Sequence, residues 1–199
     1  YTGNLKTVNF KIGYLLNNNL LGNISLNTEI NGKGFDSKNA DITIKGSIYS
    51  IDFKKYNYKN IELVGNFSKK HFNGELVVND PNIGMNFSGK IDLSKKLPEY
   101  NFNTEITDAK LSVLNLYKGK LDTIGTNNLS ANISCNFIGN EIDNLQGEIN
   151  VKDITLEENE KEYNISSLIV TNRIDNNSLK HIKINSDYLD VEVNGKIVF

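Results

Sequence analysis

The sequence predicts an all-β protein, in the form of an elongated, curled antiparallel sheet of repeated hairpins shaped like a half-pipe, or β-taco. Three observations predict this fold. Apolar residues occupy every second position in most segments, which is the period of a strand with one dry face. Turn-forming clusters separate these segments about every 8 to 12 residues, as in proteins built from hairpins. Only one segment carries a helical signal.

The alternating segments follow one another from Ile24, Leu26 and Ile30 to Val191 and Val193. Clusters rich in Asn, Asp, Gly and Pro predict turns between them, because these residues tolerate left-handed or preset backbone angles. The clusters lie at residues 31–32, 79–82, 139–140 and 175–177. About fourteen antiparallel strands are expected, and at roughly 4.8 Å per strand they form a sheet on the order of 65 Å long.

The helical signal lies at residues 108–115. Asp108 stands in an N-cap position ahead of Leu111, Val113 and Leu114, so one or two helical turns are expected there. One short helix is too small to cover the apolar face of the whole sheet. A second sheet, the same sheet curled into a barrel or half-pipe, or an apolar ligand must therefore face it, and periodicity alone does not choose among these.

An internal repeat divides the chain. Residues 76–91 match residues 182–197 without a gap, 106 positions later. We therefore interpret residues 1–199 as a single segment of a longer β-groove with two loosely repeated units, at about 22–106 and 107–199. The start at Tyr1 and the apolar end at 195–199 also predict a fragment. No apolar run of about 18 residues and no charged leader is visible, so neither a membrane-spanning helix nor a signal peptide is expected within it.

Composition excludes several classes of function. The formal net charge is -2 and the pI is about 5.8, and Arg173 is the only arginine, so nucleic acid is not an expected partner. Cys135 is the only cysteine, which excludes an internal disulfide and predicts a small buried hydrophobe. The sequence contains no zinc, nucleotide-binding or nucleophile motif and no calcium loop. No catalytic residue, no metal and no cofactor are expected, and the chain is not expected to be an enzyme.

Glycines and turn residues spaced by alternating strands recur as LLGNI at 20–24, NGKGF at 31–35, ITIKGSI at 42–48 and YNYKNIELVGNF at 56–67. Further examples are FNGEL at 72–76, NDPN at 79–82, NSDYLD at 185–190 and NGKI at 194–197. Through these features nearly the whole chain resembles the TamB-like translocation and assembly module family. This family is related to the AsmA group of bridge-like lipid transfer β-groove proteins.

The resemblance implies a periplasmic β-groove that shields lipid acyl chains and conducts phospholipid between the inner and outer membranes. In the full-length protein, a helix absent here would anchor it in the inner membrane, and its far end would meet an Omp85-type outer-membrane barrel. An assembly or chaperone role for outer-membrane proteins is the alternative within the same resemblance. A β-sandwich adhesin or carbohydrate-binding module also stays open, although tryptophan, a common sugar platform, is absent.

By the same resemblance, the working residues are the apolar strand positions that would line the groove and contact acyl chains. They are Ile42, Ile44, Ile61, Leu63, Leu76, Val78, Ile83, Met85, Phe87, Ile91, Leu93, Ile133, Phe137, Ile149, Val151, Ile182, Ile184, Leu189, Val191 and Val193.

Overall fold

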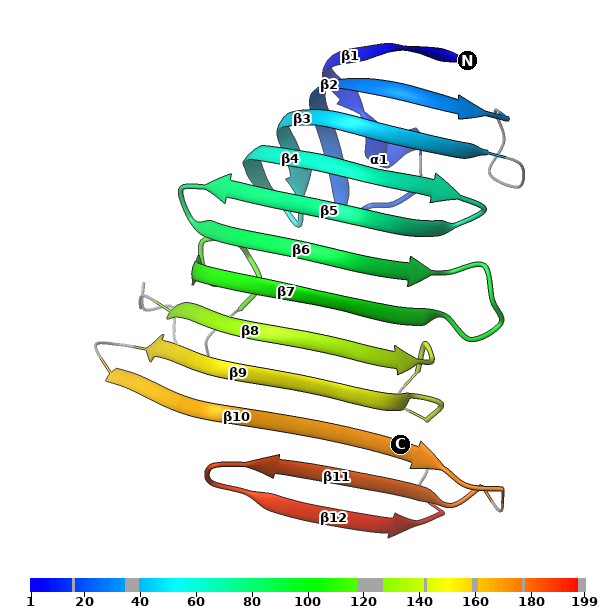
Figure 1. The fold of residues 1–199 in the computed structure, drawn as a ribbon. Helices are drawn as coiled ribbons and strands as arrows, with labels where there is room; N and C mark the ends of the chain where they lie inside the picture. Colours follow the sequence, from blue (N-terminus) through cyan, green and yellow to red (C-terminus); the bar gives the residue numbers. More distant parts are fainter. Residues whose placement is uncertain are drawn as a thin grey trace.

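The structure is a computed structural model that describes residues 1–15, 17–34, 40–117, 127–141, 143–158, 161–176 and 178–196. Within these ranges the chain forms strands and one short helix (Figure 1). The elements are β1 (Thr2–Lys11), α1 (Ile12–Leu15), β2 (Leu21–Lys33), β3 (Asp41–Phe53), β4 (Tyr56–Ser68), β5 (His71–Asp80), β6 (Ile83–Asp92), β7 (Glu99–Lys110), β8 (Asn127–Ile138), β9 (Gln146–Glu158), β10 (Lys161–Ile174), β11 (Lys180–Ser186) and β12 (Asp190–Gly195).

All strands of the described residues belong to one sheet in the order β1 to β12, and each strand pairs antiparallel with its neighbours in the chain. The expected fold class is confirmed: a curled antiparallel sheet of hairpins with one short helix. The sheet does not close on itself, because β1 and β12 lie at opposite edges. It has twelve strands where about fourteen were expected, and at roughly 4.8 Å spacing it is on the order of 53 Å long. No second sheet packs on it among the described residues.

The helix expected at residues 108–115 is wrong. Asp108 lies inside β7 with a left-handed φ of 48°, and its backbone N–H donates to Ser130 Oγ at 3.1 Å. The residues after β7 form hydrogen-bonded turns, in which the Leu114 N–H donates to the Lys110 carbonyl at 3.0 Å. Asp favours both helix N-caps and left-handed positions, so an Asp at this position does not distinguish a helix start from a bulge. The helix of the described residues is α1, which the sequence did not indicate.

The turn expected at residues 31–32 is also wrong. Strand β2 continues to Lys33, and Gly32 pairs with Ile42 of β3. Its small size is required there, because a Cβ on Gly32 would lie 2.7 Å from the Asp41 carbonyl oxygen. The other clusters do separate strands: 79–82 spans the β5–β6 turn, 139–140 follows β8, and 175–176 follows β10. Asn177 lies outside the described residues.

Left-handed Asn and Asp residues interrupt four strands and allow the sheet to bend. They are Asn9 in β1, Asn60 in β4, Asp108 in β7 and Asp153 in β9, with φ between 48° and 53°. The Asn9 N–H donates to Ser25 Oγ on β2 at 3.0 Å, just as Asp108 donates to a serine on β8. The strand pairing shifts by one residue at Asn9, Asp108 and Asp153, and bulges of this kind increase the bend and twist of a strand. Figure 1 shows the curl of the sheet most clearly in β2, β3 and β4.

Strand pairing divides the sheet into two chemically different faces, since directly paired residues point to the same side. We call the apolar side the inner face. Its central inner row crosses all twelve strands without a charged or amide side chain: Gly3, Ile30, Ile44, Gly65, Gly74, Gly89, Phe102, Cys135, Ile149, Val170, Ile184 and Val191.

The opposite side is the outer face, which is mostly polar. Its central outer row consists of Asn4, Glu29, Lys45, Val64, Glu75, Ser88, Asn103, Ser134, Asn150, Ile169, Asn185 and Asp190. The asymmetry follows from alternation alone, because a strand residue and its successor point to opposite faces. The central row of the outer face is therefore mostly polar, and the central row of the inner face is apolar.

The two repeated sequence segments form hairpins of equal register. Val78 of β5 pairs with Met85 of β6, and the corresponding Ile184 of β11 pairs with Val191 of β12. Both hairpins lie in the same continuous sheet, and residues 106 and 107 are neighbours within β7. The chain therefore repeats a hairpin without a break in the sheet between the two copies.

Candidate functional site

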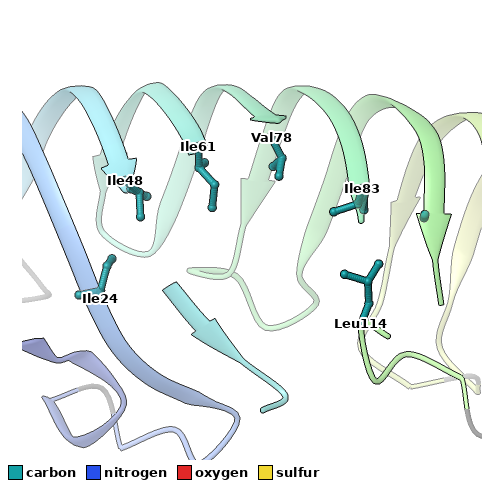
Figure 2. Close-up of a cluster of buried hydrophobic side chains, with 7 residues drawn as sticks. Ile24, Ile48, Ile61, Val78, Ile83 and Leu114 are labelled. Carbon is teal, nitrogen blue, oxygen red and sulfur yellow. The ribbon is translucent and has the colours of Figure 1, made fainter. Parts of the chain in front are cut away.

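The bend of the sheet is filled by the protein's own apolar side chains. One buried residue comes from each of β2 to β7, and Leu114, which has 0% of its surface exposed, joins them from the turns after β7. We call this set the bend core: Ile24, Ile48, Ile61, Val78, Ile83, Ala109 and Leu114. Figure 2 shows Ile48, Ile61, Val78 and Ile83 on the concave side of the arched strands, with Leu114 lying opposite Ile83. Packing of this core fixes the curvature of the sheet.

A polar network fastens the bend next to this core. Asp80 is buried and accepts hydrogen bonds from the Tyr56 hydroxyl at 2.5 Å and from the backbone N–H groups of Lys59 and Asn82, each at 2.9 Å. The Asn82 amide donates to the Tyr56 hydroxyl oxygen at 2.8 Å. Burial, followed by the hydrogen bond to Asp80, raises the pKa of Tyr56. The network ties β4 to the β5–β6 turn without an uncompensated buried charge.

Aromatic rings form a ladder on the inner face at a distance from the bend. Ring centroids lie 4.7 Å apart for Phe67 and Phe72, 6.1 Å for Phe72 and Phe87, and 5.2 Å for Phe87 and Phe102. Phe67 is 38% exposed, so this part of the face is open to solvent. The Phe72 ring lies over Gly65, where an added Cβ would approach its Cε2 to 2.5 Å. Ring-over-glycine contacts of this kind support a strand position that has no side chain.

The inner face is hollowed further along the sheet. A cavity of ≈ 310 Å³ lies over β8 to β11, at the lower end of the range for small-molecule sites. Its lining is apolar apart from Gln146 and Asn172: Phe137, Leu145, Gln146, Gly147, Ile149, Val170, Asn172, Ile182 and Ile184. Leu114 and the rest of the bend core lie outside this lining. The hollow is therefore a part of the apolar face that the protein does not fill itself.

Two buried groups lie near this hollow. Cys135 precedes Phe137 on β8, and burial raises the pKa of its thiol, as expected for a structural cysteine. Lys180, at the start of β11, is buried and its Nζ pairs with the Asp143 carboxylate. This pairing compensates the buried charge. Asn172 donates from Nδ2 to the Leu145 carbonyl at 2.6 Å, which joins β10 to the loop before β9.

Of the twenty residues predicted to line a groove, eighteen lie in strands on the inner face. The strand register and the alternation of side chains relative to the central inner row place them there. Leu93 and Leu189 instead lie in turns next to β6 and β12, where they are 48% and 52% exposed. Ile61, Val78 and Ile83 belong to the bend core and are not accessible. The prediction omitted other inner-face residues that the same alternation could have found: Phe67, Phe72, Tyr100, Phe102, Leu168 and Val170.

Neither a metal site nor a membrane-spanning helix is evident in the part of the chain that the structure describes. No three His, Cys, Asp or Glu side chains there lie close enough together to hold a metal ion. Within the same residues, no helix has the length and apolar character needed to span a membrane.

Comparisons with known proteins add no assignment. No protein-family model, no curated protein and no solved structure matches this chain.

Proposed function

We propose that the chain is a segment of an envelope protein that shields the acyl chains of phospholipid in its apolar groove and conducts phospholipid between the inner and outer membranes. The observation that carries the proposal is the central inner row, which presents twelve apolar or glycine positions in succession and no charged or amide group. A hydrocarbon chain lying along such a row meets no group that demands hydration. The function needs no catalytic residue.

The energetics suit such a groove. Burying a hydrocarbon chain stabilises it by roughly 0.8 kcal/mol per methylene, so an acyl tail of about 16 carbons gains on the order of 13 kcal/mol. A lipid that crosses water without a carrier must expose its tails and lose this stabilisation. In a groove the tails stay buried, because a shift by one strand spacing replaces one apolar contact with another. The bend core holds the curvature of the sheet, and exposed inner-face residues such as Phe67 and Val193 lie outside this core.

The location and partners belong to the same proposal and are supported by the resemblance to the TamB-like family. The segment would lie in the periplasm, with the inner membrane reached through an anchoring helix and the outer membrane through an Omp85-type barrel. An assembly role for outer-membrane proteins would use the same apolar face to hold extended apolar strands. That alternative predicts binding of unfolded protein in place of lipid.

The proposal is tested by native mass spectrometry of protein purified without detergent from a phospholipid-containing host. Bound phospholipid is expected, without selectivity for the head group, because the groove contacts the tails. Phe87→Asp and Val193→Asp place a charge on the inner face and should each reduce the bound fraction at least fivefold. Asn86→Asp and Asn194→Asp place the same charge on the outer face of the same strands and should not.

Circular dichroism of each variant completes this test. We expect the inner-face variants to keep the strand spectrum of the parent, because Phe87 is only partly buried and Val193 is exposed. Unfolding of both variants would mean that these positions belong to a closed core, which contradicts an accessible groove. Absence of phospholipid from the unaltered protein would contradict the proposal directly.

A further inference from the structure

The two ends of the strands differ in how far the protein covers its own inner face. At one end the strands bend over, and Ile51, Tyr56 and Tyr58 pack against the bend core. At the other end Phe67 is 38% exposed and Leu93 is 48% exposed. We call this second end, formed by the β4–β5 turn and the β6–β7 loop, the open rim; Figure 1 shows both connections on the same side of the sheet. A lipid whose tails lie on the ladder of phenylalanine rings would carry its head group at the open rim.

The open rim carries four lysines. Lys69 and Lys70 form the tip of the β4–β5 turn, and Lys95 and Lys96 lie in the β6–β7 loop. All four are exposed. The Leu93 N–H donates to the Lys70 carbonyl at 3.0 Å, so the turn and the loop lie side by side. The lysines therefore form one basic surface that borders the phenylalanine ladder.

Three of these lysines have no acidic partner among the described residues. The charge of Lys95 is compensated by the carboxylates of Asp92 and Glu99, whose oxygens lie 3.9 and 2.5 Å from its Nζ. The other three form no ion pair with any residue that the structure describes. An anion at the open rim would thus meet cations that no carboxylate neutralises.

The order of apolar and charged groups at the open rim matches that of a phospholipid. Lys69 follows Phe67 by two residues, which is about 7 Å along a strand. In a phospholipid, apolar tails are joined through a glycerol linker to a phosphate anion. The lysine ammonium is a point charge on a flexible stem and a common ligand of phosphate in proteins. Tails on the rings would therefore bring the phosphate within reach of the lysines.

We infer that the open rim binds the phosphate group of a phospholipid whose tails lie on the phenylalanine ladder, so that lipids occupy the groove with their head groups at this rim. The inference rests on the proposed function and adds an orientation and a recognised group to it. All phospholipids share the phosphate, so the contact selects no particular head group. It does distinguish a phospholipid from diacylglycerol, which has the same tails and no phosphate. Salt should weaken the contact, because the lysines are exposed.

The opposite end of β4 supplies a matched control. Lys54 and Lys55 form the β3–β4 turn with φ of 49° and 67°, and Lys69 and Lys70 have nearly the same φ, 50° and 66°. The two pairs thus have equal charge and similar backbone, but Lys54 and Lys55 lie at the covered end. Asn adopts left-handed φ more readily than Lys, so replacing either pair by Asn removes two charges and preserves the turn.

Native mass spectrometry of delipidated protein in detergent micelles tests the inference. The micelles contain equal amounts of phosphatidylglycerol, phosphatidylethanolamine and diacylglycerol, all with the same two tails. The unaltered protein should bind each phospholipid at least tenfold more than diacylglycerol. Lys69→Asn with Lys70→Asn should lower this ratio at least threefold and leave diacylglycerol binding unchanged. Lys54→Asn with Lys55→Asn should leave the ratio unchanged, and circular dichroism of both double variants checks that they are folded.

The outcomes separate this inference from the proposed function. Absence of all three lipids would contradict the proposed function and this inference with it. Equal binding of phospholipid and diacylglycerol would leave the proposed function intact and overturn this inference alone. A ratio that Lys69→Asn with Lys70→Asn leaves unchanged would also overturn it. The same holds for an equal fall in both double variants, because the preference would then depend on net charge and not on the open rim.

Discussion

Because Leu114 belongs to the bend core, we predict that shortening its side chain lowers the stability of the protein by a large amount. Leu114→Ala removes three carbons from a side chain with no exposed surface. At about 0.8 kcal/mol per carbon, the lost transfer free energy is about 2.4 kcal/mol. A cavity term of about 1 kcal/mol adds to it, because the turns that carry Leu114 are held by backbone hydrogen bonds and relax only in part. The free energy of unfolding should therefore fall by about 3 to 4 kcal/mol.

Urea unfolding followed by far-ultraviolet circular dichroism measures this change. The adjacent Val113 is 49% exposed, so Val113→Ala is the matched control and should change the free energy of unfolding by less than about 0.5 kcal/mol. A loss below about 1 kcal/mol for Leu114→Ala, or a loss equal to that of the control, would refute the assignment of Leu114 to the bend core. Phospholipid bound per folded molecule should not fall in either variant, because Leu114 is not part of the hollow's lining.

Three further predictions concern polar and titratable groups. Tyr56→Phe removes the hydroxyl that donates to Asp80 and should lower the free energy of unfolding by about 1.5 to 3 kcal/mol, measured by the same urea titration; a neutral result would mean that the network does not fasten the bend. Burial raises the pKa of the Cys135 thiol, so its alkylation at pH 8 should be at least tenfold slower in the native protein than in urea, and equal rates would contradict its burial. Hydrogen bonds from the Asn57 side chain and the Asn23 backbone lower the pKa of Asp52 below its ordinary 3.8, so the stabilisation they provide is present above that pH and is lost as the pH falls below it. Between pH 6 and pH 2, the thermal midpoint of Asn57→Ala should therefore fall less steeply than that of the parent. An unchanged pH dependence would mean that Asp52 does not contribute to the acid sensitivity of the fold.

The two faces of the sheet were predictable from the sequence because alternation fixes which side chains share a face. For example, the spacing of Ile182 and Ile184 predicts that they share one face of the sheet, and on that face they pair with Val193 and Val191 of β12. Antiparallel hairpins followed from turn residues, as at Pro81 between β5 and β6. These features are local, and local propensity determines them.

The bend and its core were not predictable in the same way. The short polar side chain of Asp108 suits either a helix N-cap or a left-handed bulge. Only the pairing of β7 with β8 selects the bulge. Gly32 is a turn residue by composition, but close approach of β3 makes it a strand residue. Leu114 lies beyond the strand pattern, in a segment whose spacing predicts a helix, so strand alternation does not place it in the core. Each case depends on contacts between segments distant in sequence.

The most direct test of the central claim is photocrosslinking of acyl chains by a benzophenone amino acid placed one position at a time along both central rows. The inner positions are Ile44, Phe102, Ile149 and Ile184. The outer positions are the residues that follow them in the same strands: Lys45, Asn103, Asn150 and Asn185. An accessible apolar groove predicts phospholipid adducts at all four inner positions and none at the outer ones. Adducts absent from the inner row, or equally frequent on both rows, would contradict the account.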